Sequence, residues 1–241
     1  MDCQSCLRNY SFNCSASLPF ARDEPAFRAA FADFEGLSYP QWLTLNNFGV
    51  LADTREPLLM PKPTRSTADN KRRFMATVRK GDILITGQRI NGLIGHAAIM
   101  TTDYWVLEMP GGSGWQHGIK DNNRQIGKDK WFDIHKADWT TVYRLKDSNV
   151  AHSAATWADH HYYDPNGGAT KTIHITYKIT GDVWSLNPSY CSKLVTHAYY
   201  FGTGNKPVIN KQMMSAARVI VPTLVPNYFT AQYPLINKGK F

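Results

Sequence analysis

The chain has 241 residues and a mass of 27.2 kDa, which is enough for one large domain or for one domain with an extension. Hydrophobic residues make up 43% of the sequence and charged residues only 19%, so the composition excludes wholesale disorder. The sequence contains no run of about 18 apolar residues, so we expect no transmembrane segment. Four cysteines are too few for a small disulfide-built fold.

The charge of the chain is strongly basic. Lysine and arginine outnumber aspartate and glutamate by 27 to 19, a net charge of +8. This excess favours nucleic acid, anionic lipid or the acidic polymers of a cell wall as surroundings, or simply a solvated basic surface. The densest basic run is Lys71-Arg72-Arg73, and no zinc-finger, RRM or helix-turn-helix pattern accompanies it. We therefore expect no nucleic acid partner and retain an anionic wall polymer or a lipid surface.

The first 75 residues are expected to form an N-terminal helical extension and a linker. A helix is predicted to begin near Asp23, a good N-cap, because apolar residues follow it at helical spacing. Residues 61–73 combine proline, threonine and basic residues, which is typical of a linker. The sequence therefore predicts an extension at 1–75 and a main domain at 76–241.

From residue 76 onward the pattern changes to strands. In chain order, strands are expected at 82–86, 96–100, 104–108, 140–145, 172–179 and 219–221, the second and third forming a hairpin. Helices are expected at 149–161 and 190–201. A glycine-rich loop of about 25 residues begins at Pro110 and is too long to be idle in a compact domain. These elements predict an α+β fold in which a mainly antiparallel sheet or small barrel packs against helices.

The cysteines divide into a group of three and a single residue. Cys3-x-x-Cys6 provides half of a zinc site and Cys14 only a third ligand, so one disulfide within the trio, or free thiols, is the expectation. The same N-terminal stretch lacks the apolar region of a signal peptide. This fits a cytoplasmic protein or a mature chain whose leader was removed, and we expect the second, an extracytoplasmic or secreted location.

Cys191 is the single cysteine. Ser189 or Asn187 is predicted to cap a helix whose first turn contains Cys191. A thiol there lies near the positive end of the helix dipole and near free backbone N–H groups, which favour the nucleophilic thiolate and can also hold an oxyanion. The alternative is an inert cysteine of the core.

A nucleophilic cysteine needs a base, and eight histidines are available. His96 begins an apolar strand directly after Gly95, and Glu108 closes the partner strand in an apolar stretch where a carboxylate needs a partner. Strand pairing through the turn at 102–103 brings the two side chains together, and the carboxylate then holds the imidazole in the required tautomer. A purely structural histidine–glutamate hydrogen bond is the alternative.

The other histidines are weaker candidates. His160 and His161 end a predicted helix, where adjacent histidines are more typical of a surface than of a metal site. His197 lies about 240° around its helix from Cys191 and faces away from it. His174 is out of phase with the apolar face of its strand. We expect no metal and no cofactor, and three histidines have no supporting context: His117, His135 and His152.

Four motifs, taken together, resemble a known family. They are Gly81-Asp82-Ile83, Gly95-His96-Ala97-Ala98-Ile99, Val106-Leu107-Glu108 and Tyr190-Cys191-Ser192-Lys193-Leu194-Val195. In this order, over roughly residues 78–222, they resemble the circularly permuted NlpC-like cysteine hydrolases, the YiiX- and YycO-like branch. The resemblance implies a permuted papain-like fold. It also implies Cys191 as nucleophile, His96 as general base and acid, and Glu108 as the orienting residue.

The function implied by this resemblance is that of a cysteine peptidase or amidase. Such an enzyme cleaves an amide bond through a thioester, and the resemblance suggests peptidoglycan or other cell-wall peptides as substrates. Tyr190, Gly95 and Trp115 are expected to shape the substrate site, with His117 and Trp131 in the same loop. The alternative with the same triad is a lipid-directed acyl hydrolase or acyltransferase. A binding module with an idle triad is the third possibility.

Overall fold

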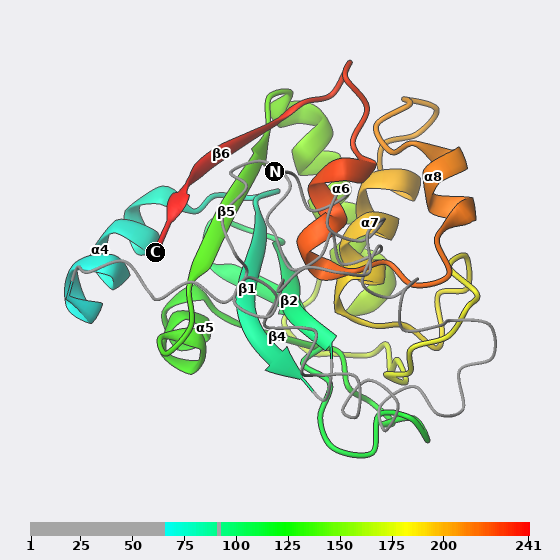
Figure 1. Cartoon of the computed structure of the whole chain (residues 1–241), viewed down its shortest axis with the longest axis horizontal. Coiled ribbons are helices and arrows are strands. Elements are labelled where there is room, and N and C mark those ends of the chain that lie inside the picture. Colours follow the sequence, from blue (N-terminus) through cyan, green and yellow to red (C-terminus); the bar gives the residue numbers. More distant parts are fainter. Residues whose placement is uncertain (1–65, 91–92) are drawn as a thin grey trace, which may run out of the picture.

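The computed structural model describes residues 66–90 and 93–241. The helix predicted from Asp23 and the cysteine trio lie outside these residues. Figure 1 shows the described elements, whose bounds in chain order are α4 (Thr67–Thr77), β1 (Ile83–Ile90), β2 (Leu93–Met100), β3 (Trp105–Glu108), β4 (Arg124–Gly127), α5 (Lys128–His135), β5 (Thr140–Leu145), α6 (Ser148–Tyr162), α7 (Cys191–Phe201), α8 (Lys211–Ala216), the 3-10 helix η3 (Pro222–Tyr228) and β6 (Leu235–Lys240).

The described strands form one six-stranded antiparallel sheet in the order β4-β3-β2-β1-β5-β6. The predicted hairpin is present, and it places Ala98 of β2 opposite Glu108 of β3. The α+β architecture with an antiparallel sheet is therefore confirmed. The sheet is open, because the edge strands β4 and β6 do not pair with each other, so the small-barrel alternative is wrong.

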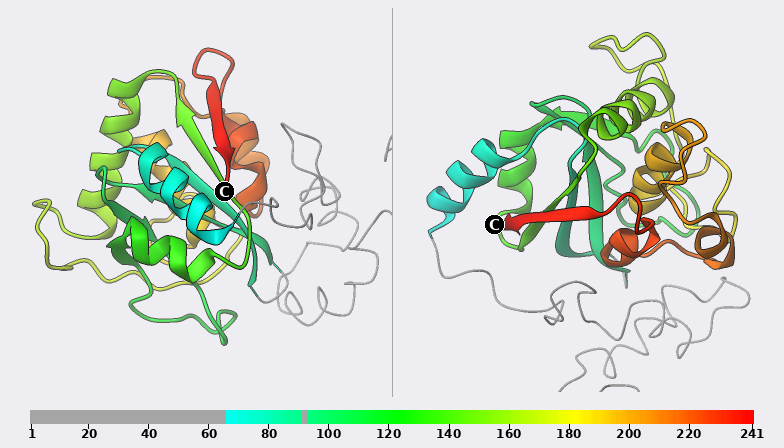
Figure 2. Two further views of the ribbon diagram at one scale, coloured as in Figure 1. Left: turned by 90° about the vertical axis from the view of Figure 1, so that its left-hand side faces the viewer. Right: turned by 90° about the horizontal axis from the view of Figure 1, so that it is seen from above.

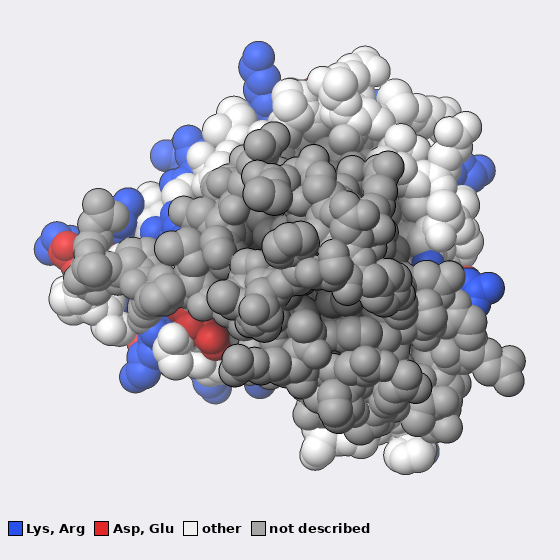
Figure 3. Space-filling model, viewed as in Figure 1, with Lys and Arg blue, Asp and Glu red and all other residues white. Residues whose placement is uncertain are grey.

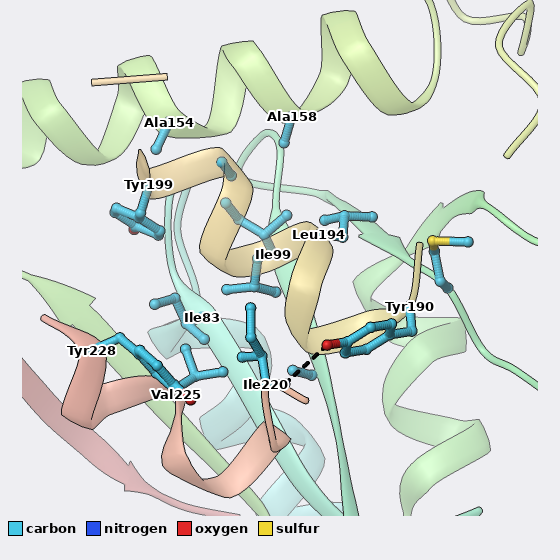
Figure 4. Close-up of a cluster of buried hydrophobic side chains, with 14 of the residues drawn as sticks. Ile83, Ile99, Ala154, Ala158, Tyr190, Leu194, Tyr199, Ile220, Val225 and Tyr228 are labelled. Carbon is cyan, nitrogen blue, oxygen red and sulfur yellow. Dashed lines mark hydrogen bonds between the residues drawn. The ribbon is translucent and has the colours of Figure 1, made fainter. Parts of the chain in front are cut away.

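Helices cover both faces of the sheet because its central strands are apolar on both sides. Ile83 and Ile85 of β1 belong to one buried cluster, which α6, α7 and η3 complete, whereas Leu84 between them belongs to a second cluster with α4 and α5. The two helical layers lie on opposite sides of the strands in Figure 2. In Figure 4 the first cluster joins Ile99 of β2 to Leu194 of α7, so the helix that carries Cys191 packs directly on the strand that carries His96.

The two predicted helices of the first layer are confirmed to within two residues. The Asp147 side chain caps α6 by accepting hydrogen bonds from the backbone N–H groups of Asn149 and Val150, both at 3.1 Å. The buried face of α6 is built largely from alanines, which allow α7 to approach closely: Ala151, Ala154, Ala155 and Ala158. Nine of the eleven residues of α7 are buried, so the cysteine sits on a rigid element.

The predicted linker at 61–73 is wrong from Thr67 onward, because α4 begins there. The Ser66 hydroxyl caps this helix by accepting from the N–H of Asp69 at 3.2 Å. Phe74 is completely buried and stacks on Trp131, with ring centroids 5.8 Å apart. The boundary expected at residue 75 therefore falls inside a helix that packs against the second cluster.

Three further expectations about elements are wrong. The long loop expected from Pro110 contains β4 and α5, whose buried Trp131, Phe132 and His135 give α5 an inner face. Residues 172–179 alternate in burial as predicted, but they form only isolated bridges at Tyr177. The strand expected at 219–221 is absent, and the last strand is β6, whose polar sequence is typical of an edge strand.

In Figure 3 the visible lysines and arginines of the described residues lie at several separate places around the rim of the molecule. Tyr104 and Trp105 are adjacent, largely exposed aromatic residues, with exposed fractions of 47% and 43%. None of the helices in the described part is both long enough and apolar enough to cross a membrane.

Replacing Phe74 by alanine is expected to lower the free energy of unfolding by about 3–5 kcal/mol, because it removes a fully buried aromatic ring between α4 and α5. Urea denaturation followed by circular dichroism measures the change. Arg72→Ala on the exposed face of the same helix is the control and should leave the midpoint close to that of the wild type. An equally small effect of both substitutions would show that α4 is not part of the folded domain.

Candidate active site

His96 and Glu108 meet between neighbouring strands. His96 lies two residues before Ala98, the β2 residue that pairs with Glu108, so the two side chains are diagonal neighbours on one face. The His96 Nε2 and Glu108 Oε2 atoms are 2.6 Å apart, and both side chains are fully buried. The structure thus brings together the pair that the sequence selects.

Side chains from three elements hold the Glu108 carboxylate. Arg124 of β4 donates from Nε to Oε1 at 2.7 Å, and its Nη2 forms an ion pair with the same oxygen at 2.6 Å. Trp131 of α5 donates from Nε1 to Oε2 at 2.9 Å, the oxygen that also binds His96. Burial raises the pKa of Glu108, but its contacts with His135 and His96 and the charge of Arg124 outweigh burial and hold that pKa well below its usual value. Glu108 is therefore an ionised, fixed acceptor.

His135 is a member of the site that sequence reasoning missed. Its ring stacks on that of His96, with centroids 5.4 Å apart, and lies 4.3 Å from the ring of Trp131. His135 Nε2 is 3.7 Å from Glu108 Oε2, too long for a hydrogen bond. Burial lowers the pKa of His135, so this ring is neutral beside the charged pair. The sequence holds one indication that His135 belongs with Trp131: the two residues are four positions apart, which places them on one helical face.

Cys191 is the first residue of α7, and Tyr190 is its N-cap with no side-chain cap bond. The predicted caps are wrong: Ser189 bonds to the Tyr162 hydroxyl at 3.2 Å, and Asn187 accepts from the N–H of Thr176 at 3.0 Å. The geometry of an α-helix leaves the N–H groups of this first turn without partners inside the helix. The helix N-terminus therefore presents backbone donors and positive dipole charge beside the thiol.

The pKa shifts of Cys191 and His96 favour an ion pair between them. Because His96 Nε2 is bound to Glu108, Nδ1 is the ring nitrogen left for the thiol, and it is buried with no hydrogen-bond partner among the described residues. Burial raises the pKa of the Cys191 thiol, but the His96 imidazolium and the backbone N–H of Ala97 outweigh burial and lower that pKa. Burial lowers the pKa of His96, yet its contacts with Cys191 and Glu108 raise it to about 10. Both shifts favour the thiolate with the imidazolium over the neutral pair.

The three residues expected to shape the substrate site have packing roles in this structure. The Tyr190 hydroxyl accepts a hydrogen bond from the N–H of Ile220 at 2.9 Å, which Figure 4 shows as a dashed line. Gly95 has φ +90°, and an added Cβ would lie 3.1 Å from Thr223 Cγ2, so glycine lets η3 approach β2. Trp115 is only 3% exposed and belongs to the first cluster.

The two other loop residues expected near the cleft lie in different surroundings. Trp131 lies in α5 and donates to Glu108, as described above, whereas His117 is exposed.

A histidine–glutamate–histidine set within the site has the donor types of a metal centre. The ligand atoms of His96, Glu108 and His135 lie within 4.8 Å of one another. These are zinc-binding side chains, but Arg124 and Trp131 already occupy the carboxylate oxygens together with His96. His96, Arg124 and Trp131 thus form a hydrogen-bonded network around Glu108, whereas both ring nitrogens of His135 are buried with no hydrogen-bond partner among the described residues.

Comparisons with known proteins identify the family. The sequence profile described as "Lipoprotein N-acylation protein LnsA-like" matches residues 57–237. An uncharacterized 30.3 kDa protein of Bacillus thuringiensis is 36% identical over 160 residues, which is 65% of this chain and 55% of that protein, so the chain spans little more than half the length of this relative. No solved structure matches the chain. The profile covers His96, Glu108 and Cys191, and the chain belongs to the family of LnsA-like lipoprotein N-acylation proteins.

Proposed function

We propose that this protein is a cysteine acyl hydrolase or acyltransferase that acts on the acyl chain of a lipid. Membership of the family implies an enzyme of lipid-related acyl transfer or hydrolysis. It favours the lipid-directed alternative over the cell-wall amidase, for which neither the fold nor the family offers support. The chain order His96, Glu108, Cys191, with the cysteine at the start of a helix on an antiparallel sheet, supports a permuted papain-like arrangement.

The observation that carries the proposal is that Cys191, His96 and Glu108 are all buried, with His96 bonded to Glu108 and its pKa raised by both of the other residues. In the proposed reaction, the Cys191 sulfur attacks the carbonyl carbon of an ester, and an S–C bond forms. The C–O bond to the lipid alcohol breaks as His96 gives its proton to the departing oxygen. The N–H groups at the start of α7 stabilise the oxyanion.

The second half of the reaction returns the enzyme to its starting state. Water or an amine attacks the thioester, His96 takes the proton of that nucleophile, and the thiolate of Cys191 departs. Water gives a free fatty acid, and an amine gives an N-acyl product. Cys191 is only 2% exposed, so an ester reaches the sulfur after a local opening near the start of α7.

A substrate panel tests the proposal. Vesicles of dioleoylphosphatidylglycerol or dioleoylphosphatidylcholine, muropeptides and unmodified peptides would each be incubated with the full chain and with Cys191→Ala. We expect oleate or lysophospholipid from the vesicles with the wild type alone. Release of new amino groups from muropeptides, with no change in the lipids, would instead support the cell-wall amidase.

The ion pair predicts a bell-shaped dependence of kcat/KM on pH. Activity rises on the acid side through the lowered pKa of Cys191, which lies below the ordinary thiol value of 9.0. It falls on the alkaline side near pH 10, where His96 loses the proton that the leaving group needs. Iodoacetamide alkylation of Cys191, followed by peptide mass spectrometry, should show only the acid limb. An alkylation midpoint at or above pH 9 would contradict a preformed thiolate.

A further inference from the structure

The segment 182–189 leads directly into the nucleophile, and a lysine in the first turn of α7 holds it. The Lys193 Nζ donates to the Asp182 carbonyl at 2.7 Å and to the Pro188 carbonyl at 3.0 Å. A third bond of 2.9 Å runs from the same nitrogen to the Ser185 hydroxyl. An ammonium has three N–H donors, so all three are used. The helix is thereby bonded to three points of the chain that precedes it.

A second side chain of α7 holds the same segment. His197 lies one turn after Lys193 on the same helical face, and its Nε2 donates to the Val183 carbonyl at 2.7 Å. Burial lowers the pKa of His197 to about 4, so the ring is neutral and its Nδ1 accepts from the Tyr162 hydroxyl at 2.9 Å. That hydroxyl in turn accepts from the Ser189 hydroxyl at 3.2 Å. The segment is therefore bonded to the helical layer along most of its length.

Lys193 occupies a place that is unfavourable for a cation. Its side chain is completely buried, and its three acceptors are neutral oxygens rather than a carboxylate. The first turn is also the positive end of the helix dipole, which disfavours a positive charge. Burial lowers the pKa of Lys193 to about 8, so the ammonium still predominates at pH 7. Because an apolar side chain could fill such a position without this cost, the lysine points to a role in function.

The start of α7 has to be fixed without a side-chain cap. Such a cap accepts from the N–H groups of the first turn, and these are the donors that the proposed reaction needs for its oxyanion. Tyr190, the N-cap residue at the start of α7 in Figure 4, makes no cap bond with its side chain. The Lys193 ammonium lies 5.9 Å from the centre of the Tyr190 ring, a cation–π contact with the N-cap residue itself. The contacts of Lys193 thus fix where the helix begins and do not occupy its N–H groups.

We propose that Lys193 is a positioning residue, which fixes the chain before Cys191 so that the thiol and the N–H groups at the start of α7 keep their orientation. In this role Lys193 acts through the segment 182–189. The inference rests on the proposed function in taking Cys191 as the nucleophile, and it holds for any acyl substrate. It gives Lys193 a role that neither the resemblance nor the family description assigns.

The test is iodoacetamide alkylation of Cys191 as a function of pH in the full chain. Lys193→Met replaces the ammonium by an apolar side chain of similar length. We expect the alkylation midpoint to rise by about one pH unit, because a helix start that is no longer fixed stabilises the thiolate less. Alkylation needs no lipid, so the result stands even where the substrate panel fails.

Ser185→Ala separates the effect of position from that of charge. This variant keeps the Lys193 ammonium but removes one of its three acceptors, in an irregular, half-buried part of the chain where alanine should not prevent folding. The midpoint should rise in the same direction by roughly half a pH unit. If Lys193 acted through its charge alone, Ser185→Ala would match the wild type. This second variant also decides the question if Lys193→Met does not fold.

Lys128→Met is the matched control, because it removes another ammonium that donates to a backbone carbonyl, that of Met75 at 2.8 Å. Lys128 begins α5 and has no bond to the segment 182–189, so the alkylation profile of this variant should match the wild type. A wild-type midpoint in folded Lys193→Met or in Ser185→Ala, with folding checked by circular dichroism, would overturn the assignment. An equal rise in Lys128→Met would overturn it as well.

Discussion

Cys191→Ala is expected to abolish acyl turnover while the protein still folds. The substitution removes the only atom of the site that can form the covalent intermediate, and loss of a catalytic nucleophile costs about 10⁴-fold or more in kcat. The side chain lost is small, and the helix that carries it is buried along most of its length, so the fold should persist. Release of oleate from vesicles measures turnover, and circular dichroism measures folding.

The matched control for Cys191→Ala is a chain in which the other cysteines are replaced. The triple variant Cys3→Ser, Cys6→Ser, Cys14→Ser should keep wild-type turnover, because the sequence places no histidine–carboxylate pair with that trio. Full activity in folded Cys191→Ala, or loss of activity only in the triple variant, would transfer the nucleophile to the N-terminal cysteines.

Glu108→Gln is expected to reduce kcat by roughly 10³- to 10⁴-fold, as the amide replacement of an orienting carboxylate does in other hydrolase triads. Glutamine keeps the shape of the side chain but removes the charge that supports the His96 imidazolium at 2.6 Å. The pKa of His96 should then fall from about 10, and the thiolate should lose its counter-ion. The alkaline limb of the activity profile would move to lower pH.

Asp82→Asn is the control, because it also replaces a buried carboxylate by the corresponding amide. Asp82 is a buried carboxylate that accepts two hydrogen bonds of 2.7 Å from Arg144, and it lies beside Met100, four residues along the strand from His96. This variant should lose stability but keep its kcat at a temperature where it is folded. If both substitutions lowered kcat equally, the effect of Glu108→Gln would be a general loss of buried charge rather than a loss of orientation.

The central part of the fold was predictable because its signals are local. β2 and β3 are short apolar runs joined by a turn, and α6 and α7 show helical periodicity, so the pairing of His96 with Glu108 follows from the hairpin. The elements that were missed have weak local patterns. β6 reads Leu-Ile-Asn-Lys-Gly-Lys and becomes a strand only by pairing with β5.

The site was predictable only as far as its reacting residues. Cys191 and His96 carry recognisable chemistry in their motifs, whereas Arg124 and Trp131 reach the site through contacts with Glu108 that no motif predicts. The segment that holds Arg124 and Trp131 has the composition of a glycine-rich loop, yet it supplies two side chains that donate to the Glu108 carboxylate. Burial of a carboxylate in an apolar stretch was the signal that such donors must exist.

The most direct test of the account is the covalent state of Cys191 during turnover. The full chain would be mixed with dioleoylphosphatidylglycerol vesicles, quenched in acid within the first turnovers and digested for peptide mass spectrometry. The account predicts one oleoyl group on the peptide that contains Cys191, removable by hydroxylamine and absent from Cys191→Ala. Oleate release that proceeds equally in Cys191→Ala, with no acyl group on that peptide in the wild type, would contradict it.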